Sequence, residues 1–251
     1  MKFNIVIATM NGAQTLESTI GSIFSQTYPK WEIIVQDGGS TDGTLDILKQ
    51  CGSRVNWSSE PDTGIYDAWN KAVQRVTGDW VLFLGADDCL ISKHTFAQCF
   101  PHIARLPDSI RFAYGALLFD EKEDGAHLAV NRPLRMVYHN FLLNMGLPFP
   151  STFVHASLFR EHSFDASYAI AGDYDFTARL LTRDNLARLP VWVSFMRQGG
   201  ISNRPENAAK LLTERLRVLR ESVAPRAGEF VHAIADHIMD NDFSIEDLLE
   251  D

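Results

Sequence analysis

The chain has 251 residues, a formal net charge of −9 and a hydrophobic fraction of 45%. This length suits one large α/β domain or two small ones, and the acidic balance argues against a nucleic-acid partner, which needs a basic surface. The three cysteines, at positions 51, 89 and 99, fit neither a disulfide framework nor a metal-binding spacing. No apolar run reaches the roughly 18 residues of a membrane-spanning helix. We therefore expect a cytoplasmic protein.

The first 90 residues alternate between apolar runs and helical patterns. Apolar runs predict strands at 3–9, 31–36, 55–57 and 80–84. Helical spacing of apolar residues predicts helices after residues 12 and 42, and a third over 66–76 that Gly78 ends. Strands and helices in this alternation predict a parallel sheet with right-handed crossovers.

The pattern changes after about residue 92. Residues 110–119 and 126–131 are predicted to pair as strands around a polar turn at 120–125. A helix is predicted over 173–182 and a strand over 189–197. From residue 205 the pattern is helical, and the acidic end at 244–251 is expected to fray.

The predicted C-terminal helix, over 207–223, has an apolar face flanked by basic residues. Interfacial helices have this arrangement, so the helix is a candidate for peripheral contact with the inner face of the cell membrane. The favoured alternative is that its leucines pack on the rest of the chain, because the chain is acidic and the segment has no aromatic anchor. The leucines are Leu211, Leu212, Leu216 and Leu219, and the flanking cations are Lys210, Arg215, Arg217 and Arg220.

Three polar blocks, at 37–44, 60–71 and 85–88, each follow an apolar run. Because the carboxyl ends of parallel strands meet at one edge of a sheet, where ligands bind, we expect all three blocks to face one cleft. The adjacent carboxylates of Asp87 and Asp88 repel each other unless hydrogen bonds or a cation compensate them. A divalent metal that also holds substrate phosphates is the simplest explanation.

The block that begins at Asp37 has two interpretations. Its Gly, Ser, Thr and Asp residues are typical of a turn followed by a helix cap, and its glycines also permit close approach of a ligand to the carboxylate. The first turn, at residues 10–14, lacks the Gly-x-Gly-x-x-Gly pattern, and the chain has no P-loop motif. A nicotinamide or P-loop nucleotide site is therefore disfavoured.

Taken in order, the blocks resemble the family 2 glycosyltransferases, which are nucleotide-diphospho-sugar transferases of the GT-A fold. The run Ser-Glu-Pro-Asp-Thr-Gly-Ile-Tyr-Asp-Ala-Trp-Asn-Lys at 59–71 is similar to the bacterial branch that builds O-antigen, colanic acid and other exopolysaccharides. The resemblance is dense over residues 3–90 and resumes at 171–176 and 199–202.

The resemblance implies an α/β, Rossmann-like fold, with a parallel-dominated sheet and helices on both faces. The GT-A domain would span 1–204, with a nucleotide half over 1–90 and an acceptor half over 91–204. A helical extension would follow over 205–251.

Residue by residue, the resemblance assigns the nucleotide site first. Asp37 would bind the base, commonly uracil, and the ammonium of Lys71 would meet a phosphate. The residues matched to nucleotide-sugar binding are Thr9, Asn11, Asp37, Asp67, Asn70, Lys71 and Asp87.

The matched metal ligand for Mn²⁺ or Mg²⁺ is Asp88, and the matched general base is Asp173. Asp173 and Asp175 would lie on different helix faces, and the match favours Asp173. Two departures from the family pattern affect this site. Gly85 replaces the first acid of the metal motif, and Gly172 replaces a Glu that would support the base.

The implied reaction is inverting transfer from a UDP-sugar to a glycan or a lipid-linked oligosaccharide in bacterial surface polysaccharide synthesis. Asp173 would take the proton of the acceptor hydroxyl, and the metal would neutralise the leaving diphosphate. Two other classes stay open. One is a catalytically silent sugar-nucleotide-binding module, which the two glycines allow. The other is a metal-dependent nucleotidyltransferase, although the basic glycine-rich loop of that class is missing.

Overall fold

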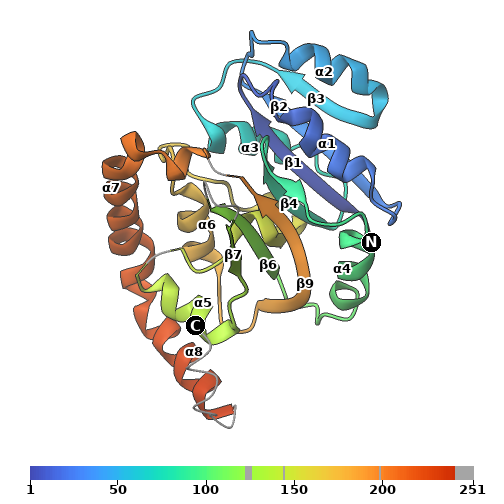
Figure 1. The fold of residues 1–251 in the computed structure, drawn as a ribbon. Coiled ribbons are helices and arrows are strands. Elements are labelled where there is room, and N and C mark those ends of the chain that lie inside the picture. Colours follow the sequence, from blue (N-terminus) through green and yellow to red (C-terminus); the bar gives the residue numbers. More distant parts are fainter. Residues whose placement is uncertain (122–125, 144, 198, 241–251) are drawn as a thin grey trace.

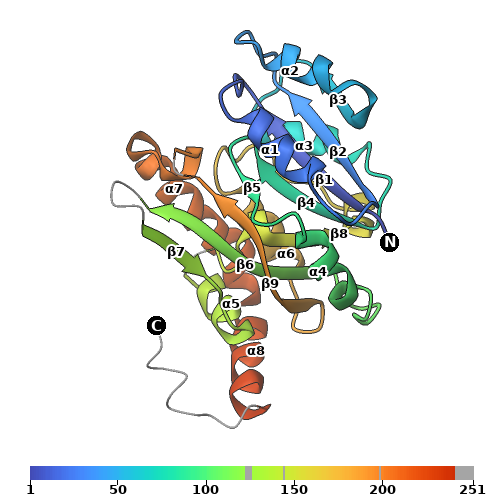
Figure 2. The same ribbon diagram turned by 45° about the vertical axis from the view of Figure 1, so that its right-hand side comes forward.

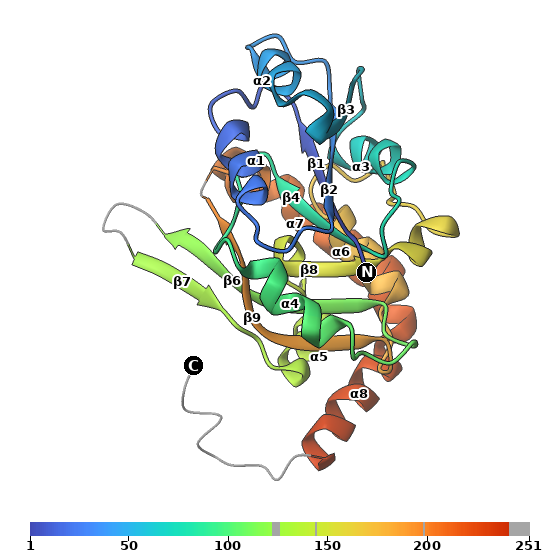
Figure 3. The same cartoon turned by 90° about the vertical axis from the view of Figure 1, so that its right-hand side faces the viewer.

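The computed structural model describes residues 1–121, 126–143, 145–197 and 199–240. One sheet of nine strands runs through the molecule in the order β3-β2-β1-β4-β8-β6-β9-β5, with β7 paired to β6 (Figure 1). Helices cover both faces of this sheet (Figure 3). The predicted α/β fold of the GT-A type is confirmed in this architecture.

The first half of the sheet is parallel, as predicted. Its strands are β1 (Phe3–Thr9), β2 (Trp31–Asp37), β3 (Val55–Ser59) and β4 (Trp80–Gly85). Strand β2 pairs in parallel with both β1 and β3, and β1 also pairs in parallel with β4. The helices between these strands are α1 (Leu16–Phe24), α2 (Thr44–Cys51) and α3 (Ile65–Val73).

The second half of the sheet is mixed. Strand β8 (Thr152–His155) runs antiparallel to β4 and to β6 (Phe112–Glu121). Strand β9 (Leu186–Met196) runs parallel to β6 and antiparallel to β5 (Cys89–Leu90). The predicted pairing of the segments near 110–119 and 126–131 is confirmed by the antiparallel pair β6 and β7 (Ala126–Val130). Residues 122–125 of the predicted turn lie outside the described residues.

Each face of the sheet has its own apolar core, because side chains alternate along a strand. On β1, Ile5 and Ile7 point to one face and Val6 to the other. The first face is covered by α1, α2 and α4 (Thr95–Ile103). The second is covered by α3, α5 (Leu134–Phe141), α6 (Gly172–Leu180), α7 (Ala208–Val218) and α8 (Ala227–Asp240). Figure 2 shows α7 and α8 following one another on that second side.

The C-terminal extension is helical, as predicted, but its four leucines do not share one face. Leu211 and Leu219 pack against the second core, whereas Leu212 and Leu216 are 60% and 56% exposed. The buried positions between them belong to Glu214 and Val218. The prediction that the four leucines form one apolar face is therefore wrong, because a buried glutamate occupies part of the helix surface that meets the domain. The acidic end at 244–251 lies outside the described residues.

Candidate functional site

Polar loops leave the carboxyl ends of adjacent parallel strands. Strand β1 lies between β2 and β4, and its register pairs Thr9 with Asp37 and Ala8 with Gly85. Strand β2 in turn pairs Asp37 with Ser59 at the end of β3. The loops that start at residues 10, 38, 60 and 86 therefore begin at the same edge of the sheet. The predicted meeting of the polar blocks at one edge is confirmed, and this edge is called the rim below.

Asp37 is fully buried, and its carboxylate is bonded within the chain. Oδ2 accepts hydrogen bonds from the N–H groups of Gly39 (3.0 Å) and Ser40 (2.9 Å) and from the hydroxyl of Ser59 (2.6 Å). Oδ1 accepts from the Ser40 hydroxyl. These bonds fold the glycine-rich loop over the end of β2, as a turn would require. Contact with a base stays a prediction.

Asn11 ties the first rim loop to the second. Its φ of 54° is left-handed, its Oδ1 accepts from the N–H of Thr41 at 2.9 Å, and its own N–H donates to Ser40 at 2.7 Å. Thr9 differs, because its buried hydroxyl has no hydrogen-bond partner. An unpartnered buried hydroxyl is costly, and contact with a ligand at the rim would satisfy it.

Helix α3 carries three of the predicted nucleotide residues. Asp67 and Lys71 form an ion pair at 3.3 Å, and the Lys71 ammonium also donates to the carbonyl of Pro61 at 2.9 Å. The charge of Lys71 is thus held at the loop that precedes α3. Asn70 instead pairs with the backbone of Phe164, donating and accepting at 2.9 Å each. This contact joins α3 to the segment before α6.

The carboxylates of Asp87 and Asp88 fold back over Gly85. A Cβ at position 85 would lie 2.6 Å from Oδ1 of Asp87 and 2.9 Å from Oδ2 of Asp88. The two acids therefore converge on the space that a side chain would fill. Gly85, read from the sequence as a lost carboxylate, makes room for the two that remain.

This pair suits a divalent cation. Asp88 is 4% exposed, and burial together with the charge of Asp87 raises its pKa to about 7. Hard carboxylate oxygens that repel each other fit Mn²⁺ or Mg²⁺. Among the described residues, no three His, Cys, Asp or Glu side chains gather as a metal-binding group. Other ligands would have to be water and substrate phosphates, as is usual for Mg²⁺.

Asp173 lies in the first turn of α6. Its Oδ1 accepts from the N–H of Tyr174 at 2.8 Å and from the phenol of Tyr66 at 3.2 Å. Burial raises the pKa of Asp173 to about 6, a value suited to a general base near neutral pH. Tyr66 belongs to α3 (Ile65–Val73), so one hydrogen bond joins the candidate base to the helix that contains much of the second polar block.

Gly172 is what allows this bond. A Cβ at position 172 would lie 2.7–2.9 Å from three carbons of the Tyr66 ring, so the ring fills the space of the family's Glu side chain. The Tyr66 hydroxyl also donates to the carbonyl of Ile170 at 2.5 Å. Support for the carboxylate therefore comes from α3 instead of from the preceding residue.

Asp175 has a different environment, as the helix geometry predicted. It is buried, its Oδ2 pairs with Arg179 at 2.8 Å, and its Oδ1 accepts from Ser222 at 2.6 Å. Asp175 thus joins α6 to the C-terminal extension, while Asp173 lines a cavity of about 130 Å³.

The sequence pattern did not reveal Glu214, which supports the segment before Asp173. Its carboxylate accepts hydrogen bonds, all at 2.9 Å, from the N–H groups of Ala169, Ile170 and Ala171. These residues lead directly into α6. The signal in the sequence was weak, because a glutamate in a basic helix normally faces solvent.

Arg197 is a second residue that the sequence pattern did not reveal. It follows β9, which reaches the rim through the pairing of Phe195 with Cys89 on β5. Its charge partly offsets the upward shift of the Asp88 pKa, and its guanidinium donates to Ser18 at 3.1 Å. A cation is thus close to the paired carboxylates.

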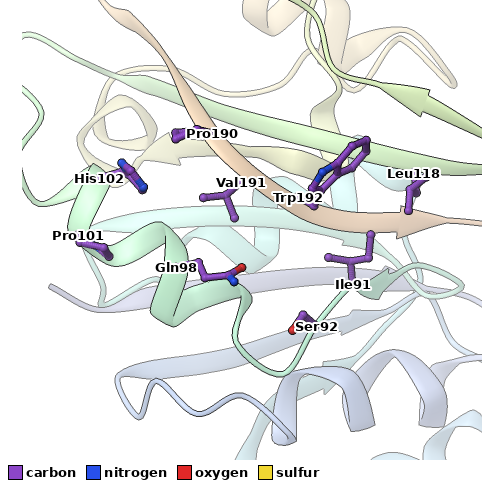
Figure 4. Close-up of a pocket in the computed structure, with 9 residues that line it drawn as sticks. All are labelled: Ile91, Ser92, Gln98, Pro101, His102, Leu118, Pro190, Val191 and Trp192. Carbon is purple, nitrogen blue, oxygen red and sulfur yellow. The ribbon is translucent and has the colours of Figure 1, made fainter.

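A separate groove lies away from these residues. Figure 4 shows it between α4, with Gln98 and His102, and β9, with Val191 and Trp192. Its volume is about 670 Å³, yet none of the predicted site residues lines it. Size alone therefore does not identify the functional site of this chain.

A parallel β/α half with a polar rim, joined to a mixed half that carries a half-buried aspartate, is typical of a glycosyltransferase of the GT-A type. The family model described as "Glycosyl transferase family 2" matches residues 4–157. The chain therefore belongs to glycosyl transferase family 2.

Two relatives match most of the chain in sequence. The chain is 31% identical over 211 residues to "PGL/p-HBAD biosynthesis glycosyltransferase" of Mycobacterium bovis BCG, covering 80% of this chain and 79% of the relative. It is 26% identical over 190 residues to the Escherichia coli "UDP-Glc:alpha-D-GlcNAc-diphosphoundecaprenol beta-1,3-glucosyltransferase WfgD", covering 74% and 72%.

The solved structures share the fold at low identity. S. aureus TarS 1–349 in complex with UDP-GlcNAc aligns with a TM-score of 0.63 at 18% identity, covering 99% of this chain and 78% of that one. The mannosyltransferase PcManGT of Pyrobaculum calidifontis, in complex with GDP-Man and Mn²⁺, aligns with a TM-score of 0.64 at 20% identity, covering 94% and 70%.

Proposed function

We propose that this chain is an inverting, metal-dependent glycosyltransferase that moves a sugar from a UDP-sugar to a glycan or lipid-linked acceptor in bacterial surface polysaccharide synthesis. The main support for the proposal is the hydrogen bond between Asp173 and Tyr66, which joins the candidate base to α3. The convergent carboxylates of Asp87 and Asp88 at the rim add to it. The relative WfgD is named for UDP-Glc and TarS was solved with UDP-GlcNAc, and both support a UDP-sugar donor.

In this reaction Asp173 is the general base. Ionised, it accepts the proton of the acceptor hydroxyl as that oxygen attacks the anomeric carbon, and the bond from that carbon to the diphosphate oxygen breaks on the opposite face. Tyr66 suits both states of the base. When Asp173 is ionised, the Tyr66 hydroxyl donates to its carboxylate. When Asp173 is protonated, the Tyr66 hydroxyl donates to the carbonyl of Ile170 and accepts a hydrogen bond from the acid.

The donor would lie along the rim. Asp88, with Asp87, would hold Mn²⁺ or Mg²⁺, and such an ion neutralises the charge of a leaving diphosphate when bound. The complex of PcManGT with GDP-Man and Mn²⁺ supports this assignment. Residues 1–90 would form the nucleotide half, 91–204 the acceptor half and 205–251 the extension. The proposed donor contacts are Thr9, Asn11, Asp37, Asp67, Asn70 and Lys71.

The products of the reaction test the proposal. A screen of nucleotide sugars with Mn²⁺ and Mg²⁺ by thermal shift identifies the donor, since a ligand at 100 times its dissociation constant stabilises a fold by about 2.7 kcal/mol. Incubation with that donor and candidate acceptors should release a nucleoside diphosphate. Pyrophosphate would instead indicate a nucleotidyltransferase, and neither product would indicate a silent binding module.

Peripheral membrane contact stays a prediction. Within the described residues, no helix has both the length and the hydrophobicity needed to cross a bilayer. On α7, the leucines exposed for such contact are Leu212 and Leu216. Sedimentation with anionic vesicles at low salt, compared with a double Leu→Gln variant at these positions, tests it. Equal sedimentation of the two proteins would exclude the helix as the contact.

A further inference from the structure

Arg215 is a cation without a partner beside the candidate base. It lies on α7 and lines the 130 Å³ cavity that also contains Asp173. Within the part of the chain that the structure describes, its guanidinium makes no hydrogen bond or ion pair. Its neighbours differ. Arg217 pairs with Asp165 at 3.1 Å and with Glu221 at 2.9 Å, and Arg220 pairs with Glu221.

The cavity is lined by residues outside the proposed nucleotide half. Each described residue that lines it comes after residue 140, whereas the rim is built from residues 9–88. Its walls include the apolar side chains of Met145, Ile170 and Leu211, and Arg215 is the cation among the described lining residues. A ligand here would reach Asp173 through residues that do not belong to the proposed nucleotide and metal site.

An anion fits the chemistry of this position. Arg215 is half-buried as a residue, in a chain whose net charge is −9, yet its guanidinium has no acid within ion-pair distance among the described residues. A planar guanidinium binds phosphate or carboxylate through two parallel N–H···O bonds, which are stronger than neutral hydrogen bonds. Arg215 also acts on the base itself, since its charge moderates the upward shift of the Asp173 pKa.

We propose that Arg215 binds a phosphate group of the acceptor and thereby brings a hydroxyl of the same molecule to Asp173. The inference rests on the proposed function and adds the chemical class of the acceptor, a phosphorylated glycan or lipid-linked sugar. The helix that carries Arg215 also carries Glu214, which positions the segment before Asp173. One helix would then hold both the base segment and the acceptor phosphate.

The probe is inorganic phosphate, titrated into the full chain by NMR at constant ionic strength in the presence of UDP and Mg²⁺. Arg215→Gln removes the charge, and Arg220→Gln is the matched control because Arg220 is 76% exposed and bound to Glu221. Wild type and control should show saturable phosphate binding with similar dissociation constants. Arg215→Gln should bind phosphate about tenfold more weakly or worse, as expected for the loss of a charged hydrogen-bond donor.

A second measurement separates acceptor from donor. UDP and Mg²⁺ affinity, measured by calorimetry, should be the same in Arg215→Gln and wild type. A tenfold loss of UDP affinity in Arg215→Gln would place Arg215 at the donor and overturn the proposal, as would unchanged phosphate binding in this variant or no saturable binding to wild type.

The two measurements keep the hypotheses distinct. Failure of the wild type to bind any nucleoside diphosphate would instead count against the proposed function. If Arg215→Gln does not fold, Arg215→Lys keeps the charge without the planar pair of donors and should show a smaller loss of phosphate affinity.

Discussion

Replacing Tyr66 by Phe tests how the candidate base is supported. The change removes one hydroxyl and leaves the ring that lies against Gly172. The lost hydrogen bond stabilises the ionised form of Asp173, so its removal must raise the pKa of that carboxyl. The acidic limb of the pH–rate profile should therefore move to higher pH.

The size of this shift follows from the geometry. The bond from Tyr66 to Asp173 is long, at 3.2 Å, and the same hydroxyl is 2.5 Å from the carbonyl of Ile170. A shared bond of this kind contributes about 1 kcal/mol, which corresponds to about 0.7 pKa units. The pKa of Asp173, about 6 in the wild type, should rise to roughly 6.7. At pH 6 the ionised fraction would fall from about one-half to about one-sixth.

Carboxyl-carbon NMR measures this pKa without an acceptor, with the Asp173 signal assigned from Asp173→Asn. The matched control is Tyr174→Phe, because Tyr174 is also buried and donates to a backbone carbonyl, that of Phe141 at 2.7 Å. Its hydroxyl has no bond to Asp173, so this control should leave the titration unchanged. The same midpoint in Tyr66→Phe, wild type and control would refute the supporting role of the phenol.

Three further substitutions test the site. Asp88→Ala should abolish metal-dependent donor binding and leave the fold intact; calorimetry with equal donor affinity in mutant and wild type, with and without Mn²⁺, would contradict the metal assignment. Asp173→Asn should keep donor binding and lower turnover by ~10²–10⁴-fold. It should also raise the free energy of unfolding at pH 7 by up to about 3 kcal/mol. In the folded chain the pKa of this carboxyl is raised from 3.8 to about 6, so its ionisation destabilises the wild-type fold as the pH rises through that range, and the amide removes this cost. Equal urea midpoints would count against this. Gly172→Ala brings a Cβ to within 2.7 Å of the Tyr66 ring and should lower the free energy of unfolding by about 1–3 kcal/mol; an unchanged midpoint would show that the ring is not held there.

The sequence was sufficient to predict the strands and helices of the first 90 residues because the signals there are local. The strands near 3–9, 31–36 and 80–84 are apolar runs ended by turn residues, and they match β1, β2 and β4 within a residue. Parallel strand order then brings the polar blocks to one edge without any knowledge of side-chain contacts. The family motifs drew attention to Asp88 and Asp173, whose roles stay proposals.

Other features depend on residues far apart in the chain. Tyr66 lies against Gly172 and forms a hydrogen bond with Asp173, which is 107 residues further along the chain. Neither position by itself therefore predicts the contact. In the sequence, Gly85 and Gly172 indicate lost acids, whereas in the fold each opens space for a neighbouring side chain: the carboxylates of Asp87 and Asp88 at Gly85, and the ring of Tyr66 at Gly172.

The C-terminal helix shows the same limit. Helical spacing of leucines predicted one face at 211, 212, 216 and 219, but docking on the domain buried Glu214 and Val218 and exposed Leu212 and Leu216. Hydrophobic periodicity cannot find a buried glutamate, because the N–H donors that satisfy it, at 169–171, lie on another segment. The sequence by itself determined the fold class, the rim and the identity of its acids. Only the tertiary structure decided which polar side chains support Asp173 and which arginine faces it, because each of those contacts is made by segments that meet only in the folded chain.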